Sequence, residues 1–364
     1  MTAFAFGITI GSFLNVVIWR LPRGKSLVTP AHSFCPNCTH ELRAIDLVPL
    51  LSFLIQGCKC RYCSKPISWR YFSVELLTGL TFLAITYHFW QTPVNCVALL
   101  LFSAILIPIF FIDLDTFTIP ASLNLFVFFI PMVRDIIGIT QHEPNHTLLA
   151  GWCPRSIFGA GAGIAIFGFI RVIGWIWKRQ EAMGLGDVLL ARGMGAFLIA
   201  FAPIGFSPLY HFLTWILLCC LSGAVVGPLM IFWRLRGQKR KKEPIEEPSE
   251  ENEQEYPEEN SNIGEQLSAI AYCLLLGDLV EYLVDITIAA LKNAERGAGF
   301  RLREHCLKLR ERWGGHADED EEEFVVAPTA IPFGPFMVIG FLLTVFFGEW
   351  MAHAYLSYAF PPIK

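Results

Sequence analysis

The hydrophobic positions of this chain gather into long runs that few charged residues interrupt. A helix that crosses a bilayer needs roughly 20 mostly apolar residues, and eight runs are long enough to be candidates. They cover residues 3–19, 71–90, 94–112, 118–137, 156–177, 188–204, 209–232 and 331–357. The pattern predicts an all-α polytopic membrane protein with about eight transmembrane helices.

The composition agrees with this fold class. Of the 364 residues, 54% are hydrophobic and only 16% are charged. The mean hydropathy of +0.49 is typical of polytopic membrane proteins. No basic residue precedes the first run, whereas Arg20, Arg23 and Lys25 follow it. We therefore expect this run to be retained as the first span and not removed as a signal peptide.

The basic residues predict the orientation of the spans. Lys and Arg are frequent in 20–70, at 178–179 and in 234–242, whereas 138–155 holds one Arg. Because Lys and Arg concentrate in cytoplasmic loops, the N-terminus should lie outside and the basic loops in the cytoplasm. Counting the crossings then places the end of the third span and the start of the sixth on the cytoplasmic side.

A hydrophilic insertion at 234–330 holds most of the acidic residues, so the net charge of −4 averages two unlike parts of the chain. Its charge runs predict a solvated, largely disordered segment. Within it, 264–292 is apolar but carries Asp278, Glu281 and Asp285 at helical spacing. This favours an amphipathic helix on the membrane or on the protein surface. A further crossing is the alternative, and it would invert the last span.

Four of the eleven cysteines form two Cys-x-x-Cys pairs separated by twenty-one residues. This is the ligand pattern of a tetrahedral structural zinc site, in which each pair supplies two thiolates. The predicted ligands are Cys35, Cys38, Cys60 and Cys63. Cys58, His32 or His40 could replace one thiolate, but Cys58 breaks the two-residue spacing that fits a knuckle. Disulfides are less favoured because the loop is predicted to lie in the reducing cytoplasm.

Two aspartates stand at the ends of apolar runs: Asp113, in Ile-Asp-Leu-Asp, and Asp187, in Gly-Leu-Gly-Asp. A charged carboxylate at bilayer depth costs several kcal/mol unless it is paired, protonated or wetted. Two that converge could share a proton and activate a water molecule, which is aspartyl-protease chemistry. Asp115 points to a different side of a helix from Asp113, and physics alone does not choose between them. Gly184 and Gly186 leave the backbone free to aim Asp187.

Other polar and small residues within the runs have structural interpretations. Asn15, Glu75 and Glu349 should satisfy neighbouring helices, although Glu75 could also tune the aspartates. The Gly7-x-x-x-Gly11 pattern and the glycines of 159–163 favour close helix packing.

These features divide the chain into five predicted parts. They are a first transmembrane helix (1–19), a cytoplasmic zinc-binding loop (20–70) whose folding energy the metal should supply, a transmembrane catalytic core (71–233), a hydrophilic acidic insertion, partly disordered and with an amphipathic helix (234–330), and a last transmembrane helix (331–364).

Several segments follow one another along nearly the whole chain outside the insertion. They are Gly11–Pro22, the double Cys-x-x-Cys, Cys60–Tyr71, Val74–Gly79, Ile112–Asp115 with Ile119–Pro120, Met183–Asp187 and Ile331–Pro335. In this set the chain resembles bacterial prepilin peptidases, the leader peptidases and N-methyltransferases of type IV pili and type II secretion.

The resemblance implies Asp113 and Asp187 as the catalytic pair, and it favours Asp113 over Asp115. The implied reaction is cleavage of type IV prepilins or type II secretion pseudopilins after a glycine, at the cytoplasmic face of the bacterial inner membrane. Many members then methylate the new N-terminus with S-adenosylmethionine, for which no separate motif is visible. The expected partners are these substrates and membrane lipid, with no nucleic acid.

The chain departs from the family pattern at two positions near the aspartates. Ala121 stands where an acidic residue is usual, and Leu189 stands where a Lys is usual, for which Arg192 could compensate. The insertion at 234–330 is also unusual for the family. Two other functions compete: an intramembrane aspartyl protease of other specificity, and a non-enzymatic transporter or scaffold. The zinc loop and the N-terminal segment argue against the first.

Overall fold

The computed structural model describes residues 1–27, 32–35, 37–141, 147–148, 153–178, 183–201, 208–240, 279, 283 and 331–359. The chain forms two compact units. Met1–Ala160 and Gly193–Phe212 make the first, and Gly161–Arg192 and Leu213–Lys364 make the second.

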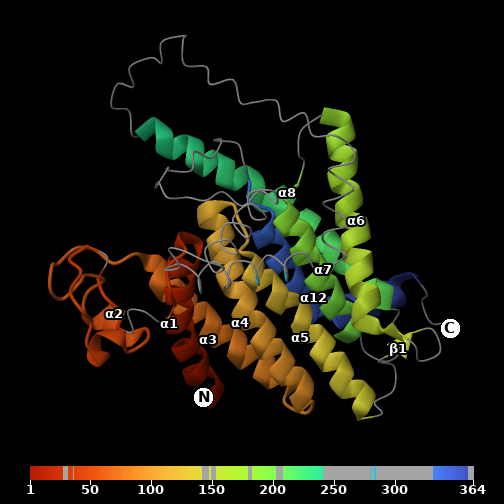
Figure 1. Ribbon diagram of the computed structural model, residues 1–364, viewed down its shortest axis with the longest axis horizontal. Coiled ribbons are helices and arrows are strands. Elements are labelled where there is room, and N and C mark those ends of the chain that lie inside the picture. Colours follow the sequence, from red (N-terminus) through yellow and green to blue (C-terminus); the bar gives the residue numbers. More distant parts are fainter. Residues whose placement is uncertain are drawn as a thin grey trace, which may run out of the picture. The chain divides into compact units, whose positions relative to one another are not determined.

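Nearly all the described secondary structure is helical (Figure 1). The helices are α1 (Thr2–Arg20), η1 (Leu21–Arg23), η2 (Ala44–Leu47), α2 (Leu51–Ile55), α3 (Trp69–Phe89), α4 (Pro93–Thr116), α5 (Ala121–Thr140), α6 (Arg155–Lys178), α7 (Leu185–Phe201), α8 (Pro208–Arg240) and α12 (Gly334–Ala359). One antiparallel pair, β1 (Thr147–Leu148) and β2 (Cys153–Pro154), precedes α6.

The predicted all-α membrane fold is confirmed. Seven of the described helices are long and apolar enough to cross a bilayer. The remaining predicted span, the sixth in sequence at 188–204, corresponds to α7, which at 17 residues is shorter than the other seven. The protein is therefore a multi-pass membrane protein.

Helix α8 is longer than its apolar run. The sequence predicts a span ending at 232 and a hydrophilic insertion from 234, but the helix continues to Arg240. Arg, Lys and Gln are good helix formers, so the basic residues prolong the helix beyond its apolar part. Apart from these last turns, Leu279 and Leu283, the insertion lies outside the described residues, as do its acidic runs and most of the amphipathic segment 264–292.

Small residues set the packing in the first unit, where α1 packs against α3 and α4, and α4 packs against α3 and α5. A Cβ at Gly7 would lie 2.9 Å from the Cα of Gly79, and one at Gly11 would lie 2.8 Å from the Cα of Glu75. The predicted close packing at the Gly7-x-x-x-Gly11 face is thus confirmed, since only glycine permits this approach.

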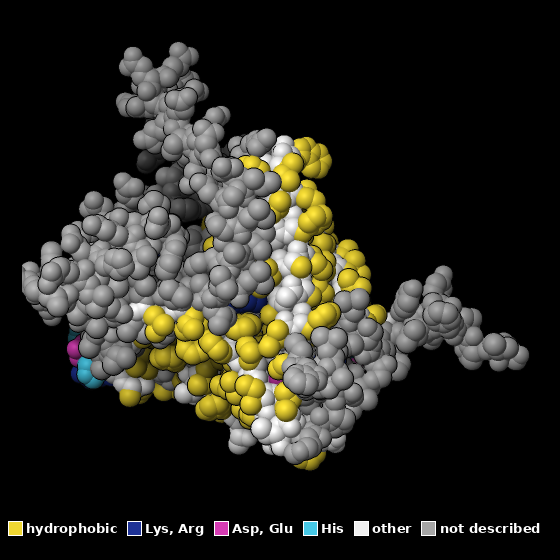
Figure 2. All heavy atoms as spheres, turned by 45° about the vertical axis from the view of Figure 1, so that its right-hand side comes forward, with side chains coloured by type: hydrophobic (Ala, Val, Ile, Leu, Met, Phe, Trp, Pro, Cys, Tyr) yellow, Lys and Arg dark blue, Asp and Glu magenta, His cyan; other side chains and the backbone are white. Residues whose placement is uncertain are grey.

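The outward surfaces of the helices are apolar. Helix α6 exposes Phe158, Phe169, Ile173 and Trp177, and Figure 2 shows that most described side chains on one face of the molecule are hydrophobic. This surface suits contact with lipid, which is as apolar as a leucine side chain.

Candidate functional site

The two cysteine pairs fold as matching knuckles. In the first, the N–H of Cys35 donates to the carbonyl of His40 at 3.0 Å and the N–H of Thr39 donates to that of Cys35 at 2.9 Å. The second repeats the pattern: Cys60 donates to Lys65 and Ser64 to Cys60, both at 2.9 Å. Thr39 and Ser64 occupy equivalent positions with φ of 55° and 58°. Each knuckle therefore turns its two sulfurs inward by the same local geometry.

The four sulfurs converge on one point. The Sγ atoms of Cys35, Cys38, Cys60 and Cys63 all lie within 4.8 Å of one another, and those of Cys35 and Cys63 are 4.0 Å apart. A tetrahedral zinc ion with bonds of about 2.3 Å would hold its sulfurs about 3.8 Å apart. The donor set and spacing fit zinc. Neither Cys58 nor either candidate histidine belongs to this cluster, so the predicted four-cysteine grouping is confirmed.

The cluster perturbs its own thiols. Burial raises the pKa of Cys60, but hydrogen bonds from the backbone of Cys63 and Tyr62 and contacts with neighbouring sulfurs outweigh it and lower that pKa to about 7. For Cys38, the backbone of His40 lowers the pKa, while burial and two neighbouring sulfurs raise it to about 11. A metal would hold all four as thiolates and release their protons.

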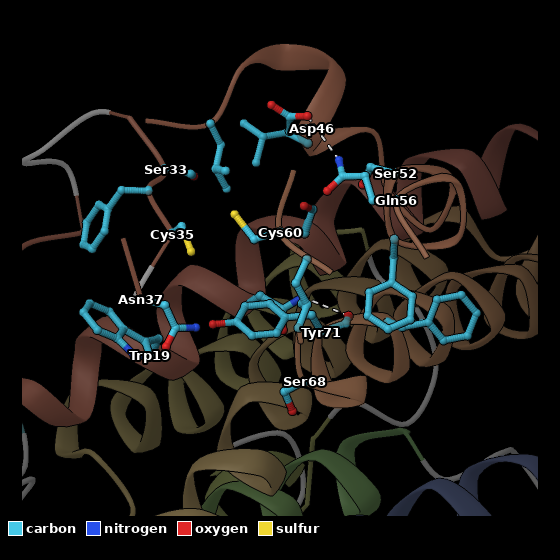
Figure 3. Close-up of a pocket in the computed structure, with 18 of the residues that line it drawn as sticks. Trp19, Ser33, Cys35, Asn37, Asp46, Ser52, Gln56, Cys60, Ser68 and Tyr71 are labelled. Atoms are coloured by element: carbon cyan, nitrogen blue, oxygen red, sulfur yellow. Dashed lines mark hydrogen bonds between the residues drawn. The ribbon is translucent and has the colours of Figure 1, made fainter. Parts of the chain in front are cut away.

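A cavity of about 460 Å³ lies beside the cluster, between the loop, α1 and the start of α3. Cys35 and Cys60 line it together with Trp19 and Tyr71 (Figure 3), and Asn15 also lines it. The side-chain amide of Asn15 donates to the carbonyl of Tyr71 at 3.1 Å. This bond joins α1 to α3, as the sequence analysis expects of Asn15.

Asp46 accepts several hydrogen bonds at the wall of this cavity, and its role was not predicted from the sequence. Its carboxylate is buried and accepts from the N–H of Arg43 at 3.2 Å, from the Gln56 amide at 3.1 Å and from the Tyr62 hydroxyl at 3.1 Å. Arg61 Nε lies 3.2 Å away. Burial and the bond to Asp46 raise the pKa of Tyr62. The sequence did contain one indication of this role, because Asp46 is the only charged residue in the apolar segment 44–55.

The aspartates of the Ile-Asp-Leu-Asp segment have different surroundings. Asp113 is buried, 3% exposed, near the end of α4. The side chain of Asp115 is 44% exposed and forms an ion pair with Arg70 in the first turn of α3. The helix thus turns the two carboxylates to different sides, as the spacing predicts.

Asp187 lies half-buried in the first turn of α7. A Cβ at Gly184 would lie 3.5 Å from the Oδ2 atom of Asp187. Arg171 of α6 donates to the carbonyl of Met183 at 2.7 Å, and this bond fixes the backbone just before α7. Asp113 belongs to the first unit and Asp187 to the second. Their convergence therefore stays a prediction from the sequence.

The residues that depart from the family pattern lie in α5 and α7. Ala121 is the first residue of α5, while Leu189 and Arg192 are buried in α7. The side chain of Leu189 is thus enclosed near Asp187, and so is the guanidinium group of Arg192.

Two family models match the chain in sequence order. The bacterial peptidase A24 N-terminal domain matches residues 5–89, and the type IV leader peptidase family matches residues 100–228.

Curated proteins of this kind are similar over most of the chain. A prepilin leader peptidase/N-methyltransferase of Myxococcus xanthus (strain DK1622) is 32% identical over 354 residues, which cover 96% of this chain and 90% of the relative. One of Aeromonas hydrophila is 32% identical and covers 65% of this chain and 83% of its own length. A type 4 prepilin-like proteins leader peptide-processing enzyme of Escherichia coli O78:H11 is 35% identical over 52% of this chain and 73% of the relative. No solved structure matches.

Proposed function

Because the chain belongs to the type IV leader peptidase family, we propose that it is a membrane-embedded aspartic endopeptidase. Its substrates are type IV prepilins or type II secretion pseudopilins, whose leader it removes after a glycine before methylating the new N-terminal amine. The supporting observation is the order of the two matched regions. The first contains the four-cysteine cluster, and the second contains both Asp113 and Asp187.

Asp113 and Asp187 carry the chemistry in this proposal. Two nearby carboxylates repel each other as anions, so the pair shares one proton. The ionised member takes a proton from water, whose oxygen bonds to the scissile carbonyl carbon. The protonated member donates toward the carbonyl oxygen. The carbon–nitrogen bond then breaks, and the departing amine takes up a proton. The burial of Asp113 supports this role, because the proposed reaction needs a carboxyl group in a site that excludes bulk water.

Zinc has a structural role in this proposal. Four thiolates would leave the ion no open position, so it would fold the loop and shape the cavity without activating water. Replacing Cys35 and Cys38 by Ser should remove the zinc and loosen the loop while the helices stay inserted. Elemental analysis of the purified protein tests this, with Cys58→Ser as the control that should keep its zinc. Zinc-free wild-type protein, or unchanged zinc in the double variant, would contradict the assignment.

The cavity beside the cluster fits the methyl donor. Its volume is within the range of about 300–1,000 Å³ usual for small-molecule sites. Trp19 and Tyr71 offer aromatic surface, and Asn15 Oδ1 is a buried acceptor with no hydrogen-bond partner in the part of the chain that the structure describes. S-adenosylmethionine, when bound, supplies a methyl group to the unprotonated amine. The chain's own contribution is to hold the donor beside the loop and exclude water.

The protein then lies in the bacterial inner membrane, with its active site at the cytoplasmic face. The support is the concentration of Lys and Arg in 20–70 and at the end of α8. Membrane lipid is then its surroundings, and the prepilin approaches within the same bilayer.

Co-expression of the chain with a prepilin, followed by mass spectrometry of the product, tests the function. We expect a product that lacks the leader and carries one added methyl group. Cleavage at a different bond would favour an aspartyl protease of other specificity. Intact prepilin in the presence of fully inserted protein would exclude the peptidase function and leave a transporter or scaffold.

A further inference from the structure

The segment 44–55, which contains η2 and α2, presents an apolar surface without charge. Its exposed large side chains are Ile45, Leu47, Val48, Leu51, Leu54 and Ile55, whose exposed fractions run from 38% to 79%. Its only charged residue, Asp46, is buried and hydrogen-bonded. A soluble loop would instead turn polar side chains outward, so this surface calls for an apolar contact.

The depth of α2 along α3 indicates what that contact is. The N–H of Leu50, directly before α2, donates to Glu75 Oε2 at 2.8 Å. Glu75 comes six residues after Trp69, the first residue of α3. At a rise of 1.5 Å per residue, this is about 9 Å along the helix axis. Since α3 is a membrane-spanning candidate, α2 lies beside the first turns of a spanning helix and not beyond its end.

Two further contacts fix this placement. Phe53 of α2 packs edge-on against Trp69, with ring centres 5.1 Å apart, and against Phe72 at 5.4 Å. Leu50 has a φ of 62°, a backbone conformation that bulky residues rarely adopt. The hydrogen bond from its N–H to Glu75 stabilises this conformation. Phe53 thus faces the protein, while Leu54 and Ile55 face away from it.

The surroundings of the segment match a membrane interface. Trp69 is 62% exposed at the start of α3, where aromatic residues of spanning helices collect at the headgroup level. Arg61 and Arg70 lie on either side of it in the chain and keep part of their side chains exposed. Each is paired with a carboxylate, Arg61 with Asp46 and Arg70 with Asp115, and the exposed part of its side chain can still contact phosphate headgroups.

We propose that η2 and α2 lie in the lipid interface, with Leu51, Leu54 and Ile55 at the boundary between headgroups and acyl chains. The zinc-binding loop is then anchored to the bilayer surface by its own apolar segment as well as by α1 and α3. An interfacial helix inserts its apolar face about 5–10 Å below the headgroup level, which agrees with the depth of α2 along α3. The inference requires α3 to span the membrane, and it does not depend on the proposed enzymatic activity.

A depth measurement on the full-length protein in lipid nanodiscs tests this proposal. A genetically encoded coumarin amino acid replaces Ile55 in one variant, Lys59 in a second and Leu80 in a third, and the lipid carries bromine on its acyl chains. Lys59 is an exposed residue of the same loop, and Leu80 is an exposed residue within α3. Retained zinc shows that each variant is folded.

We expect brominated lipid to quench the probes at both Leu80 and Ile55, and the probe at Lys59 several-fold less than the probe at Ile55. Aqueous iodide should give the reverse order. Quenching at Ile55 by lipid no stronger than at Lys59 would overturn the proposal. A probe at Ile55 that neither brominated lipid nor iodide reaches would also overturn it, because a protein partner or a second copy of the chain would then cover α2.

Discussion

Asp113 and Asp115 are two residues apart, yet their surroundings separate their roles. Asp113 is 3% exposed, whereas Asp115 is 44% exposed at its side chain and paired with Arg70. An exposed carboxylate that is already paired with a cation suits a structural role, whereas an enclosed carboxylate is a candidate for catalysis. The sequence places both residues but does not choose between them by geometry.

Asparagine substitutions test the roles of these carboxylates. Asp113→Asn and Asp187→Asn should each lower prepilin cleavage by at least about 100-fold, because an amide neither accepts the proton of water nor shares one with a partner. Asp115→Asn should keep substantial activity, since its loss affects only an exposed ion pair. The measurement is cleavage of a prepilin at matched membrane levels of the three variants. An active Asp187→Asn variant would refute the aspartyl mechanism. An active Asp113→Asn variant together with an inactive Asp115→Asn variant would show that Asp115, and not Asp113, is the catalytic residue.

Asp46 shows how one residue can hold the loop together. Its carboxylate receives two side-chain donors and one backbone N–H and lies beside Arg61. In Asp46→Asn, an amide NH2 group, which cannot accept a hydrogen bond, would face some of these donors. Each buried donor left without an acceptor lowers the stability of the loop by about 1–3 kcal/mol. We expect this variant to lose zinc to a chelator faster than wild type. Glu41→Gln, an exposed change in the same loop, should not, and equal chelation rates for all three proteins would show that Asp46 is dispensable.

At the level of elements, the sequence predicts what local patterns specify. Spans need uninterrupted apolar residues, so the apolar runs locate the helices, and the knuckles depend on a two-residue spacing. The placement of α2 beside α3 depends on contacts such as Leu50 with Glu75, which join residues 25 apart. The β1–β2 pair and the extension of α8 also went unpredicted, because two-residue strands have no periodicity and a helix can outlast its apolar part.

The glycines of α6 offer a matched test of helix packing. A Cβ at Gly159 would lie 2.7 Å from the carbonyl carbon of Gly195 and 2.9 Å from the Cα of Ala196, whereas one at Gly161 would meet nothing within 4 Å. Gly159→Ala should destabilise the protein by about 1–3 kcal/mol, because the backbone of α7 must move. Gly161→Ala should be neutral or slightly stabilising. Thermal unfolding in detergent measures both, and equal melting temperatures would show that the two helices separate without cost.

For the whole molecule, the family-matched regions and the insertion are separate in sequence. The matches end at residue 228, before the insertion at 234–330. Both aspartates and all four cluster cysteines lie inside the matched regions. The catalytic and zinc-binding groups of the proposal therefore do not include the insertion, whose acidic composition sets it apart from the apolar remainder of the chain.

Deletion of the acidic stretches 243–262 and 318–323 tests whether the insertion takes part in the reaction. These stretches are rich in Glu, Asp, Pro and Asn, a composition that buries little apolar surface, so their removal should leave the membrane helices inserted. We expect prepilin cleavage to remain largely intact and to disappear when Asp187→Asn is added, because the same carboxylates then act in both backgrounds. A deletion variant that inserts, keeps its zinc and still fails to cleave would show that the insertion contributes to substrate capture or catalysis.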